Sequence, residues 1–297
     1  MSEKIWGLAQ YVRPGAAAAE TGILTGGVVR ASAEFGATPV LDLLGDWERH
    51  EPALRRVDPS RGEVVEGARL IAPVTYPRKL LCAGANYYGH AAEMGSVPPE
   101  PGTMPFFFLK PPTTTIVGDG ATVTYPAGAD DPQLDWEAEL AVVISRTARD
   151  VTARQARDYI AGYSVANDLS ARGPFARPDA EPFAYDWMLQ KAQDGFCPFG
   201  PAMVPAWLVA DPQDLPITLT VNGVTKQDSA TSDMVIGVLD LVSSASRIMT
   251  LESGDVILTG TPGGVGLPRK DFLYPGDLVT ASVGGVGVLT SHIGSPR

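Results

Sequence analysis

The sequence predicts a β-rich α+β fold in which helix is not the dominant element. The 297 residues include 32 glycines and 26 prolines, together about one residue in five, which favours many short strands and turns over a helical bundle. The chain is long enough to bury a large core, as one big domain or as a large and a small one. We expect a small N-terminal α/β domain over residues 1–75 and a larger, strand-rich domain over 76–297.

The N-terminal unit carries no recognisable chemistry. Its predicted elements are a strand over 5–12, a hairpin over 22–33, a helix over 39–57 and a loop over 58–62. We expect this unit to act as a cap or as a dimer-contact module.

The first candidate catalytic group follows a buried strand predicted over 79–85. If the next segment, 86–95, is helical, His90 and Glu93 lie at positions i and i+3 on one face and can hydrogen-bond. Glu93 could then fix the tautomer of His90 and raise its basicity, which is the ordinary design of a general base. A surface histidine beside a surface glutamate is the alternative.

Residues 106–112 begin with Phe106-Phe107-Phe108 and predict a strand that leads into a turn. We expect these aromatic side chains to pack in the core and not to form an aromatic binding site.

The strand predicted over 134–144 carries two acids on one face. Its even positions are all apolar, while Glu137 and Glu139 share the odd face, which is the period-two signature of a β-strand. At about 3.3 Å per residue their Cα atoms lie about 6.6 Å apart, so both side chains can converge on one cation. The odd face continues with Ala141 and Val143, so the acids do not lie along a polar surface. A like-charged pair in that setting needs protonation or a cation.

A third acid, Asp168, ends another strand, predicted over 161–168. Together with Glu137 and Glu139 it offers hard oxygen ligands, with no histidine or cysteine cluster nearby. The implied metal is therefore Mg²⁺, Mn²⁺ or Ca²⁺, and Zn²⁺ is not expected. A solvated acidic face without a metal is the alternative.

Two cations downstream are candidates for binding an anionic substrate. Arg172 could clamp a carboxylate in a bidentate fashion, and Lys191 could place a point charge near an enolate oxygen. Each could equally be a surface cation.

The remaining elements complete the predicted β-rich domain. They are a helix opened by the capping box of Thr152 and Gln155, a hairpin around Asn222-Gly223, a helix over about 234–250 ended by Gly254, a strand over 256–260 and a glycine-rich loop over 261–266. That loop matches neither the phosphate-loop nor the dinucleotide pattern, so we expect no nucleotide site there.

Composition excludes several functional classes. The formal net charge is −11 and no basic cluster stands out, which argues against a nucleic-acid or anionic-membrane partner. The two cysteines, Cys82 and Cys197, form no C-x-x-C motif, as expected in a reducing compartment. We find neither a signal-peptide pattern nor a membrane-spanning run, so a cytoplasmic location is expected.

Several of these segments, in this order, resemble the fumarylacetoacetate hydrolase family, and among its members the acylpyruvate hydrolases and 2-hydroxyhepta-2,4-diene-1,7-dioate isomerases. The resemblance covers residues 77 to about 294. The segments that carry it are Gly84-Ala85-Asn86-Tyr87, His90-Ala91-Ala92-Glu93, Asp135-Trp136-Glu137-Ala138-Glu139-Leu140, Gly162-Tyr163, Asn167-Asp168-Leu169-Ser170-Ala171-Arg172, Lys191 and Thr259-Gly260-Thr261-Pro262-Gly263-Gly264-Val265-Gly266.

The resemblance implies a fold, a site and a class of reaction. The expected fold is a mixed β-sandwich roll, commonly a homodimer, that holds one divalent ion. The implied substrate is a small anionic 2-oxo or 1,3-diketo acid. The implied roles are metal ligands for Glu137, Glu139 and Asp168, catalysis for His90, Glu93 and Lys191, and substrate contacts for Arg172, Thr261 and Tyr87.

The chain departs from the family pattern at two places. After Arg172 it reads Gly173-Pro174-Phe175, so an acid and a carbonyl-binding amide are missing, and after Lys191 it reads Ala192-Gln193-Asp194. The apolar loop that follows the first departure suggests a bulkier or aromatic substrate arm; its aromatic residues are Phe175, Phe183, Tyr185 and Trp187.

Three functions remain open from the sequence. The first is a metal-dependent hydrolase that cleaves a C–C bond in an acylpyruvate-like diketo acid, in the breakdown of aromatic or related compounds. The second is a lyase or isomerase on the same scaffold, such as an oxaloacetate-type decarboxylase or an oxo-diene-dioate isomerase. The third is a non-catalytic metal-binding scaffold, against which the retained His90, Glu93 and Lys191 weigh.

Overall fold

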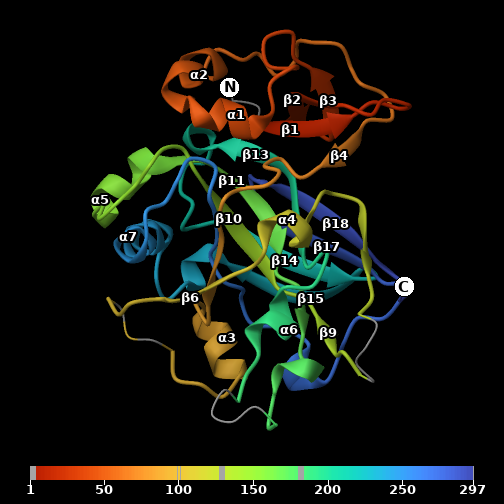
Figure 1. Ribbon diagram of the computed structural model, residues 1–297, viewed down its shortest axis with the longest axis vertical. Helices are drawn as coiled ribbons and strands as arrows, with labels where there is room; N and C mark the ends of the chain where they lie inside the picture. The colour runs from red at the N-terminus through yellow and green to blue at the C-terminus, as the bar shows by residue number, and fades with distance from the viewer. Residues whose placement is uncertain (1–4, 99, 101, 127–130, 180–183, 297) are drawn as a thin grey trace.

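A computed structural model describes residues 5–98, 100, 102–126, 131–179 and 184–296. Two sheets dominate this part of the chain, and short helices lie around them (Figure 1). The β-rich mixed fold predicted from the sequence is confirmed. No helix within the described ranges is long and apolar enough to cross a membrane.

The N-terminal segment packs at one end of the molecule (Figure 1, red and orange). Its elements are β1 (Gly7–Val12), β2 (Ala19–Thr25), β3 (Val28–Ala31), α1 (Val40–Gly45), α2 (Trp47–Leu54) and β4 (Arg69–Ile71). The predicted strand and hairpin are present, but the single helix expected over 39–57 is two helices that meet at Asp46. Strand β1 also pairs with β13 (Cys197–Pro205), which lies far along the chain, with Leu8 opposite Met203. The division at residue 75 stays a prediction.

The large sheet has eleven strands in the order β3-β2-β1-β13-β11-β10-β16-β5-β6, with β4 paired to β1 and β7 to β13. Its further strands are β5 (Leu80–Gly84), β6 (Phe106–Leu109), β7 (Ile116–Val117), β10 (Ala138–Ile144), β11 (Ile160–Asn167), β13 (Cys197–Pro205) and β16 (Val256–Leu258). The short pair β9 (Leu134–Asp135) and β12 (Ser170–Ala171) lies beside it.

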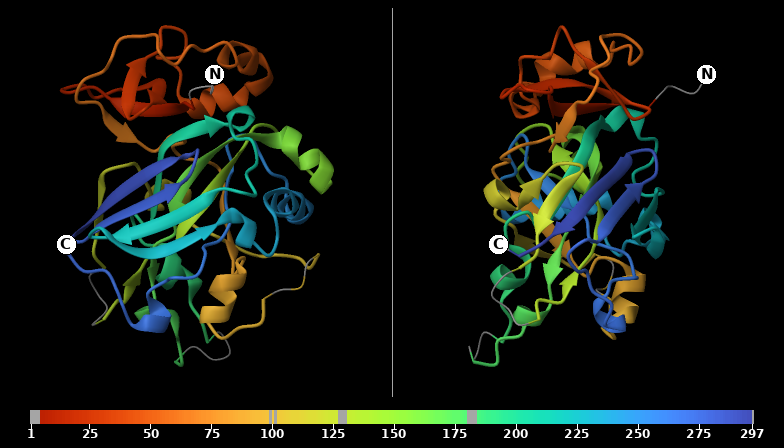
Figure 2. Two further views of the ribbon diagram at one scale, coloured as in Figure 1. Left: turned by 180° about the vertical axis from the view of Figure 1, so that it is seen from behind. Right: turned by 90° about the vertical axis from the view of Figure 1, so that its right-hand side faces the viewer.

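The second sheet has five strands in the order β15-β14-β17-β18-β8 and lies behind the first in Figure 1; the left view of Figure 2 shows it in front. The strands are β8 (Ala121–Thr124), β14 (Pro216–Val221), β15 (Val224–Ala230), β17 (Leu278–Val283) and β18 (Gly287–Gly294). Asn222-Gly223 joins β14 to β15, which confirms the predicted hairpin.

Strand β10 separates two hydrophobic cores, which explains its sequence. Its even-numbered residues, such as Leu140 and Val142, pack in the core that the second sheet shares. Ala141 and Val143 pack in a second core with residues of α1 and α2. Both faces of the strand are covered, and this is why the strand is apolar throughout except at Glu139.

The remaining helices are short. They are α3 (Tyr88–Glu93), α4 (Pro112–Thr115), α5 (Ala153–Ala156), α6 (Trp187–Lys191) and α7 (Val238–Ile248). The capping box of Thr152 and Gln155 is present, while the helix expected over 234–250 begins only at Val238 and ends at Ile248, before Gly254.

The prediction for the phenylalanine run 106–108 is wrong in part. Phe107 packs against the core, but Phe106 is 53% exposed and Phe108 lines a cavity. The physical reason is that side chains alternate along a strand, so Phe106 and Phe108 share the face of β6 opposite Phe107, and both pack on Trp187 of the cavity and not on the core.

Candidate active site

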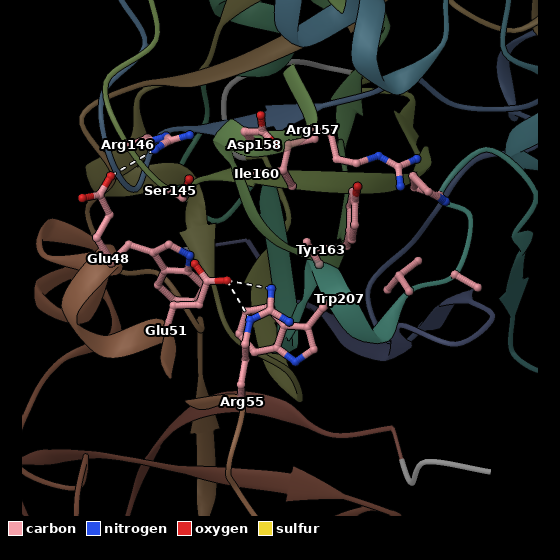
Figure 3. Close-up of a pocket in the computed structure, with 15 residues that line it drawn as sticks. Glu48, Glu51, Arg55, Ser145, Arg146, Arg157, Asp158, Ile160, Tyr163 and Trp207 are labelled. Carbon is pink, nitrogen blue, oxygen red and sulfur yellow. Dashed lines mark hydrogen bonds and ion pairs between the residues drawn. The ribbon is translucent and has the colours of Figure 1, made fainter. Parts of the chain in front are cut away.

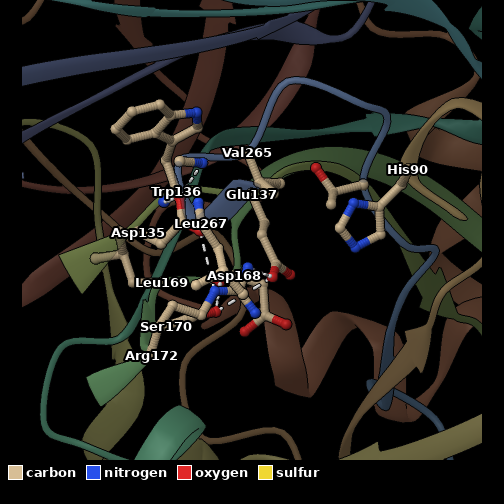
Figure 4. A network of polar contacts seen from close by, with 12 residues as sticks. His90, Asp135, Trp136, Glu137, Asp168, Leu169, Ser170, Arg172, Val265 and Leu267 are labelled. Carbon is tan, nitrogen blue, oxygen red and sulfur yellow. Dashed lines mark hydrogen bonds and ion pairs between the residues drawn. The ribbon is translucent and has the colours of Figure 1, made fainter. Parts of the chain in front are cut away.

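Three predicted metal ligands converge where β10 and β11 meet. Glu139 lies on β10, Glu137 lies between β9 and β10, and Asp168 directly follows β11. The two strands are antiparallel with Ala138 opposite Asn167, which places the start of one beside the end of the other. Each acid offers one oxygen, and these oxygens all lie within 4.8 Å of one another. Figure 4 shows Glu137 and Asp168 facing one another.

Local hydrogen bonds fix this convergence. The backbone N–H of Glu137 donates to the side chain of Asn167 at 2.9 Å, and the backbone N–H of Asp168 donates to the carbonyl of Glu137, also at 2.9 Å. The predicted strand 134–144 is interrupted at these positions, so Glu137 reaches the site from a short connection and not from the strand itself.

The three carboxylates are buried together, and their negative charges repel one another. Glu137, Glu139 and Asp168 are 6%, 1% and 1% exposed. Burial, reinforced by the negative charges of Asp168 and Glu137, raises the pKa of Glu139 well above its ordinary value. A buried cluster of hard oxygens that repel one another fits a divalent cation such as Mg²⁺, Mn²⁺ or Ca²⁺.

Two buried lysines pair with the acidic cluster. Lys191, at the end of α6, donates to Glu137 and to Asp168, each at 2.8 Å. Burial acts to lower the pKa of Lys191, but the two carboxylates outweigh it and raise the pKa to about 12. Lys110, which sequence reasoning missed, also donates to Asp168, and to the carbonyls of Leu169 at 3.2 Å and Phe196 at 2.6 Å.

Arg172 ties the cluster to the glycine-rich loop. Its guanidinium donates to Asp135 at 3.0 Å and to Glu137 at 2.6 Å (Figure 4). Asp135 in turn accepts hydrogen bonds from the backbone N–H groups of Gly266 at 2.6 Å and Leu267 at 3.1 Å. Arg172 therefore contacts two carboxylates of the protein itself. Its expected contact with a substrate carboxylate stays a prediction.

His90 and Glu93 form the predicted pair on α3. The ring Nδ1 of His90 and Oε1 of Glu93 lie 2.8 Å apart, and Oε2 of Glu93 accepts the backbone N–H of Gly264 at 2.7 Å. Burial acts to raise the pKa of Glu93, but hydrogen bonds from His90 and Gly264 outweigh it and lower the pKa. A proton on Nδ1 leaves Nε2 as the basic nitrogen, and Figure 4 shows the imidazole facing Glu137 and Asp168.

One cavity of about 310 Å³ joins these groups. Seven of the nine predicted site residues line it: His90, Glu137, Glu139, Asp168, Arg172, Lys191 and Thr261. Glu93 stands behind His90. Tyr87 is fully buried in the core and does not line the cavity. The hydroxyl of Thr261 donates to the carbonyl of Ala138 at 2.9 Å.

An aromatic wall, formed by Phe108, Phe175 and Trp187, lines the same cavity. The ring centre of Phe108 lies 5.4 Å from Nζ of Lys191. It lies 5.0 Å from the ring centre of Trp187. Phe175 lies 5.1 Å from Trp187 and stacks on Tyr185 at 4.9 Å. Phe183, the other aromatic residue expected here, lies outside the described residues.

The chain is similar to proteins with several named activities. It is 41% identical over 226 residues to the human protein named oxaloacetate tautomerase FAHD2B, mitochondrial, covering 75% of this chain and 68% of that protein. It resembles the solved 5-carboxymethyl-2-hydroxymuconate delta-isomerase of Mycobacterium smegmatis, with a TM-score of 0.73, 34% identity and coverage of 98% and 99%. The maleylpyruvate hydrolase of Sphingobium sp. SYK-6, solved with manganese(II) ion and pyruvate, has a TM-score of 0.74, 26% identity and coverage of 98% and 100%.

A family model fits most of the predicted catalytic region. The model is described as the C-terminal region of fumarylacetoacetate hydrolase, and it matches residues 79–294. That range includes both strands that position the acids, the His90–Glu93 pair and Lys191. The chain therefore belongs to the fumarylacetoacetate hydrolase family.

Proposed function

We propose that this chain is a divalent-metal-dependent enzyme that interconverts the keto and enol forms, or moves a double bond, of a small 2-oxo acid. The proposal gives the isomerase class more weight than the C–C hydrolase that the sequence first suggested. Both reactions pass through the enolate of a 2-oxo acid and need the same acidic cluster and base.

The residues divide the chemistry between binding and proton transfer. A divalent cation held by Glu137, Glu139 and Asp168 would act as a Lewis acid toward the carboxylate and keto oxygens of the substrate. In the keto-to-enol direction His90 takes a proton from C3 through Nε2, and the enolate oxygen then takes a proton from the imidazolium or from water to give the enol. In the reverse direction the enol oxygen gives up its proton and the imidazolium protonates C3. Glu93 holds the ring and stabilises the imidazolium between these steps.

The observation that carries the proposal is that His90 is placed to move a proton, while Arg172 and Lys191 contact carboxylates of the protein itself. His90 faces the acidic cluster with its other nitrogen on Glu93, so a proton can be moved. Arg172 contacts Asp135 and Glu137, while Lys191 contacts Glu137 and Asp168. Hydrolysis also needs donors for a second carbonyl, and the acid and amide that family members commonly carry after Arg172 are missing here. Tautomerisation needs no such donors.

Hydrolysis of an acylpyruvate-like acid is the second candidate, because a histidine oriented by a carboxylate can also activate water. Similarity to a solved maleylpyruvate hydrolase favours it. Either reaction leaves room for the aromatic substrate arm suggested by the sequence. A 2-oxo acid bound at the cluster would extend along Phe108 and Trp187, whose rings can stack on it. A homodimer stays a prediction.

One experiment separates the candidates. Ultraviolet absorbance follows ketonisation of the enols of oxaloacetate and phenylpyruvate, and a coupled assay follows pyruvate release from acetylpyruvate and benzoylpyruvate. Each is run with Mg²⁺ or Mn²⁺, with chelator, and with His90→Gln beside the exposed control Arg154→Gln.

The proposal expects metal-dependent ketonisation that falls in His90→Gln and persists in Arg154→Gln. It also expects phenylpyruvate to be preferred over oxaloacetate if the aromatic wall binds the arm. Stoichiometric pyruvate release without tautomerase activity would replace the proposal by hydrolysis. Loss of oxaloacetate with release of carbon dioxide would replace it by decarboxylation.

A further inference from the structure

A second cavity is larger than the acidic one. It measures about 530 Å³ and lies between the N-terminal segment and the far ends of β10 and β11 (Figure 3). Trp47 begins helix α2 and Arg55 directly follows it; Ser145 follows β10, Tyr163 lies on β11, and Trp207 lies in a turn after β13. The two cavities share no lining residue.

Aromatic and apolar side chains form about half of the lining of this cavity. The ring centres of Trp47 and Trp207 lie 6.0 Å apart with an angle of 36° between the ring planes, and Trp47 is 6% exposed. The guanidinium of Arg55 lies over the ring of Trp207 at 4.2 Å. Ile160 and Val209 add apolar contacts. Such a surface suits a flat apolar group better than a strongly hydrated one.

Most charges at the rim already have a partner. Arg55 pairs with Glu51 at 2.6 Å, and Arg146 pairs with Glu48 at 3.0 Å. Arg157 forms no ion pair with any residue that the structure describes. Figure 3 shows the side chains of Arg157 and Asp158 pointing in different directions.

Tyr163 lines this cavity together with Arg157. Tyr163 is only 4% exposed, and its hydroxyl makes no hydrogen bond with a described residue. Burial raises the pKa of Tyr163; the positive charge of Arg157 opposes this shift and the negative charge of Asp211 adds to it, so the hydroxyl keeps its proton and remains a donor at neutral pH. Arg157 is near enough for its charge to act on this hydroxyl, and both residues line the cavity. The cavity thus has one polar corner with two donors, opposite the aromatic surface.

We propose that this cavity is a second binding site, which takes a small aromatic carboxylate. The ring lies against Trp47 and Trp207, and the carboxylate accepts hydrogen bonds from Arg157 and Tyr163. The volume is within the range of roughly 300–1,000 Å³ typical of small-molecule sites. A bound ligand joins α2 of the N-terminal segment to β11, whose other end leads into Asp168. The inference does not depend on the proposed reaction.

Isothermal titration of the full chain with phenylacetate tests the site. Phenylacetamide, which lacks the charge, and cyclohexylacetate, which lacks the aromatic ring, are the matched ligands. The variants are Arg157→Gln, with Arg154→Gln three residues earlier as its control, and Tyr163→Phe, which keeps the buried ring. Glu139→Ala removes one acid of the other cavity and reports binding there.

We expect one phenylacetate per chain, with both matched ligands weaker. Arg157→Gln should raise Kd by roughly tenfold or more, as for loss of a charge-assisted hydrogen bond, and Tyr163→Phe by a smaller factor. Arg154→Gln and Glu139→Ala should leave Kd unchanged. The proposal is overturned if phenylacetate does not bind below about 10 mM, or if Arg157→Gln binds as well as the unmodified chain. It is also overturned if Glu139→Ala alone abolishes binding, or if sedimentation shows that Tyr163→Phe or Arg157→Gln dissociates an oligomer.

Discussion

Replacing Lys110 by methionine should destabilise this protein far more than its place in a strand-to-turn segment suggests. Its ammonium group is fully buried and donates to Asp168 and to the carbonyls of Leu169 and Phe196. Methionine keeps much of the volume but leaves the carboxylate and two carbonyls without this donor. Removing one partner of a buried ion pair costs about 3–5 kcal/mol. At about 2 °C per kcal/mol for a chain of this size, Tm should fall by roughly 6–10 °C.

Lys226→Met is the matched control. Lys226 also pairs with an aspartate, Asp271 at 2.5 Å, but the two side chains are 20% and 43% exposed, so the expected loss is below about 1 kcal/mol. Urea unfolding of the two variants beside the unmodified chain, without added metal, measures both losses. Equal losses in the two variants, or a loss below about 1 kcal/mol for Lys110→Met, would refute the claim that Lys110 holds the acidic cluster together.

Three further predictions concern the base and the loop behind it. His90→Gln should lower kcat by roughly 10²–10⁴-fold with little change in Tm, measured on the best substrate of the panel. Because the pKa of Glu93 is lowered on folding, its charge stabilises the protein above the unfolded pKa of about 4.3 and less as pH falls through the folded pKa. The Tm advantage over Glu93→Gln should therefore be present at neutral pH and vanish in acid, and an advantage that grows in acid would contradict the assignment. Gly264→Ala should destabilise by about 1–3 kcal/mol and also lower activity, since Gly264 has φ +111° and an added Cβ would lie 2.2 Å from the carbonyl of Lys226. Gly45→Ala, where an added Cβ meets nothing within 4 Å, should be neutral in the same thermal scan.

Local patterns in the sequence predicted the local parts of the site. The His90–Glu93 pair depends only on a spacing of three residues on a helix, so it could be read directly. The two faces of β10 were also predictable, because alternation along a strand reports which residues share a face. The interruption before Ala138 was not, since it depends on hydrogen bonds that Asn167 makes across the strand pair.

Long-range pairing explains what the sequence did not reveal. Lys110 meets Asp168 across 58 residues, and no spacing rule connects them. One signal was available: a lysine between the apolar run 106–109 and a proline is unusual unless a buried partner compensates it. Phe108 was assigned to the core because an aromatic run does not show which of its two faces packs on the core and which on Trp187, 79 residues away in the sequence.

Manganese binding to the acidic cluster tests the central claim most directly. Isothermal titration with Mn²⁺ compares the unmodified chain with Glu139→Gln, and with Glu252→Gln as a control, an acid paired with Lys79 away from the cluster. The account predicts one Mn²⁺ per chain that Glu139→Gln loses and Glu252→Gln retains. Equal Mn²⁺ binding by all three proteins would contradict the assignment of Glu137, Glu139 and Asp168 as the metal site.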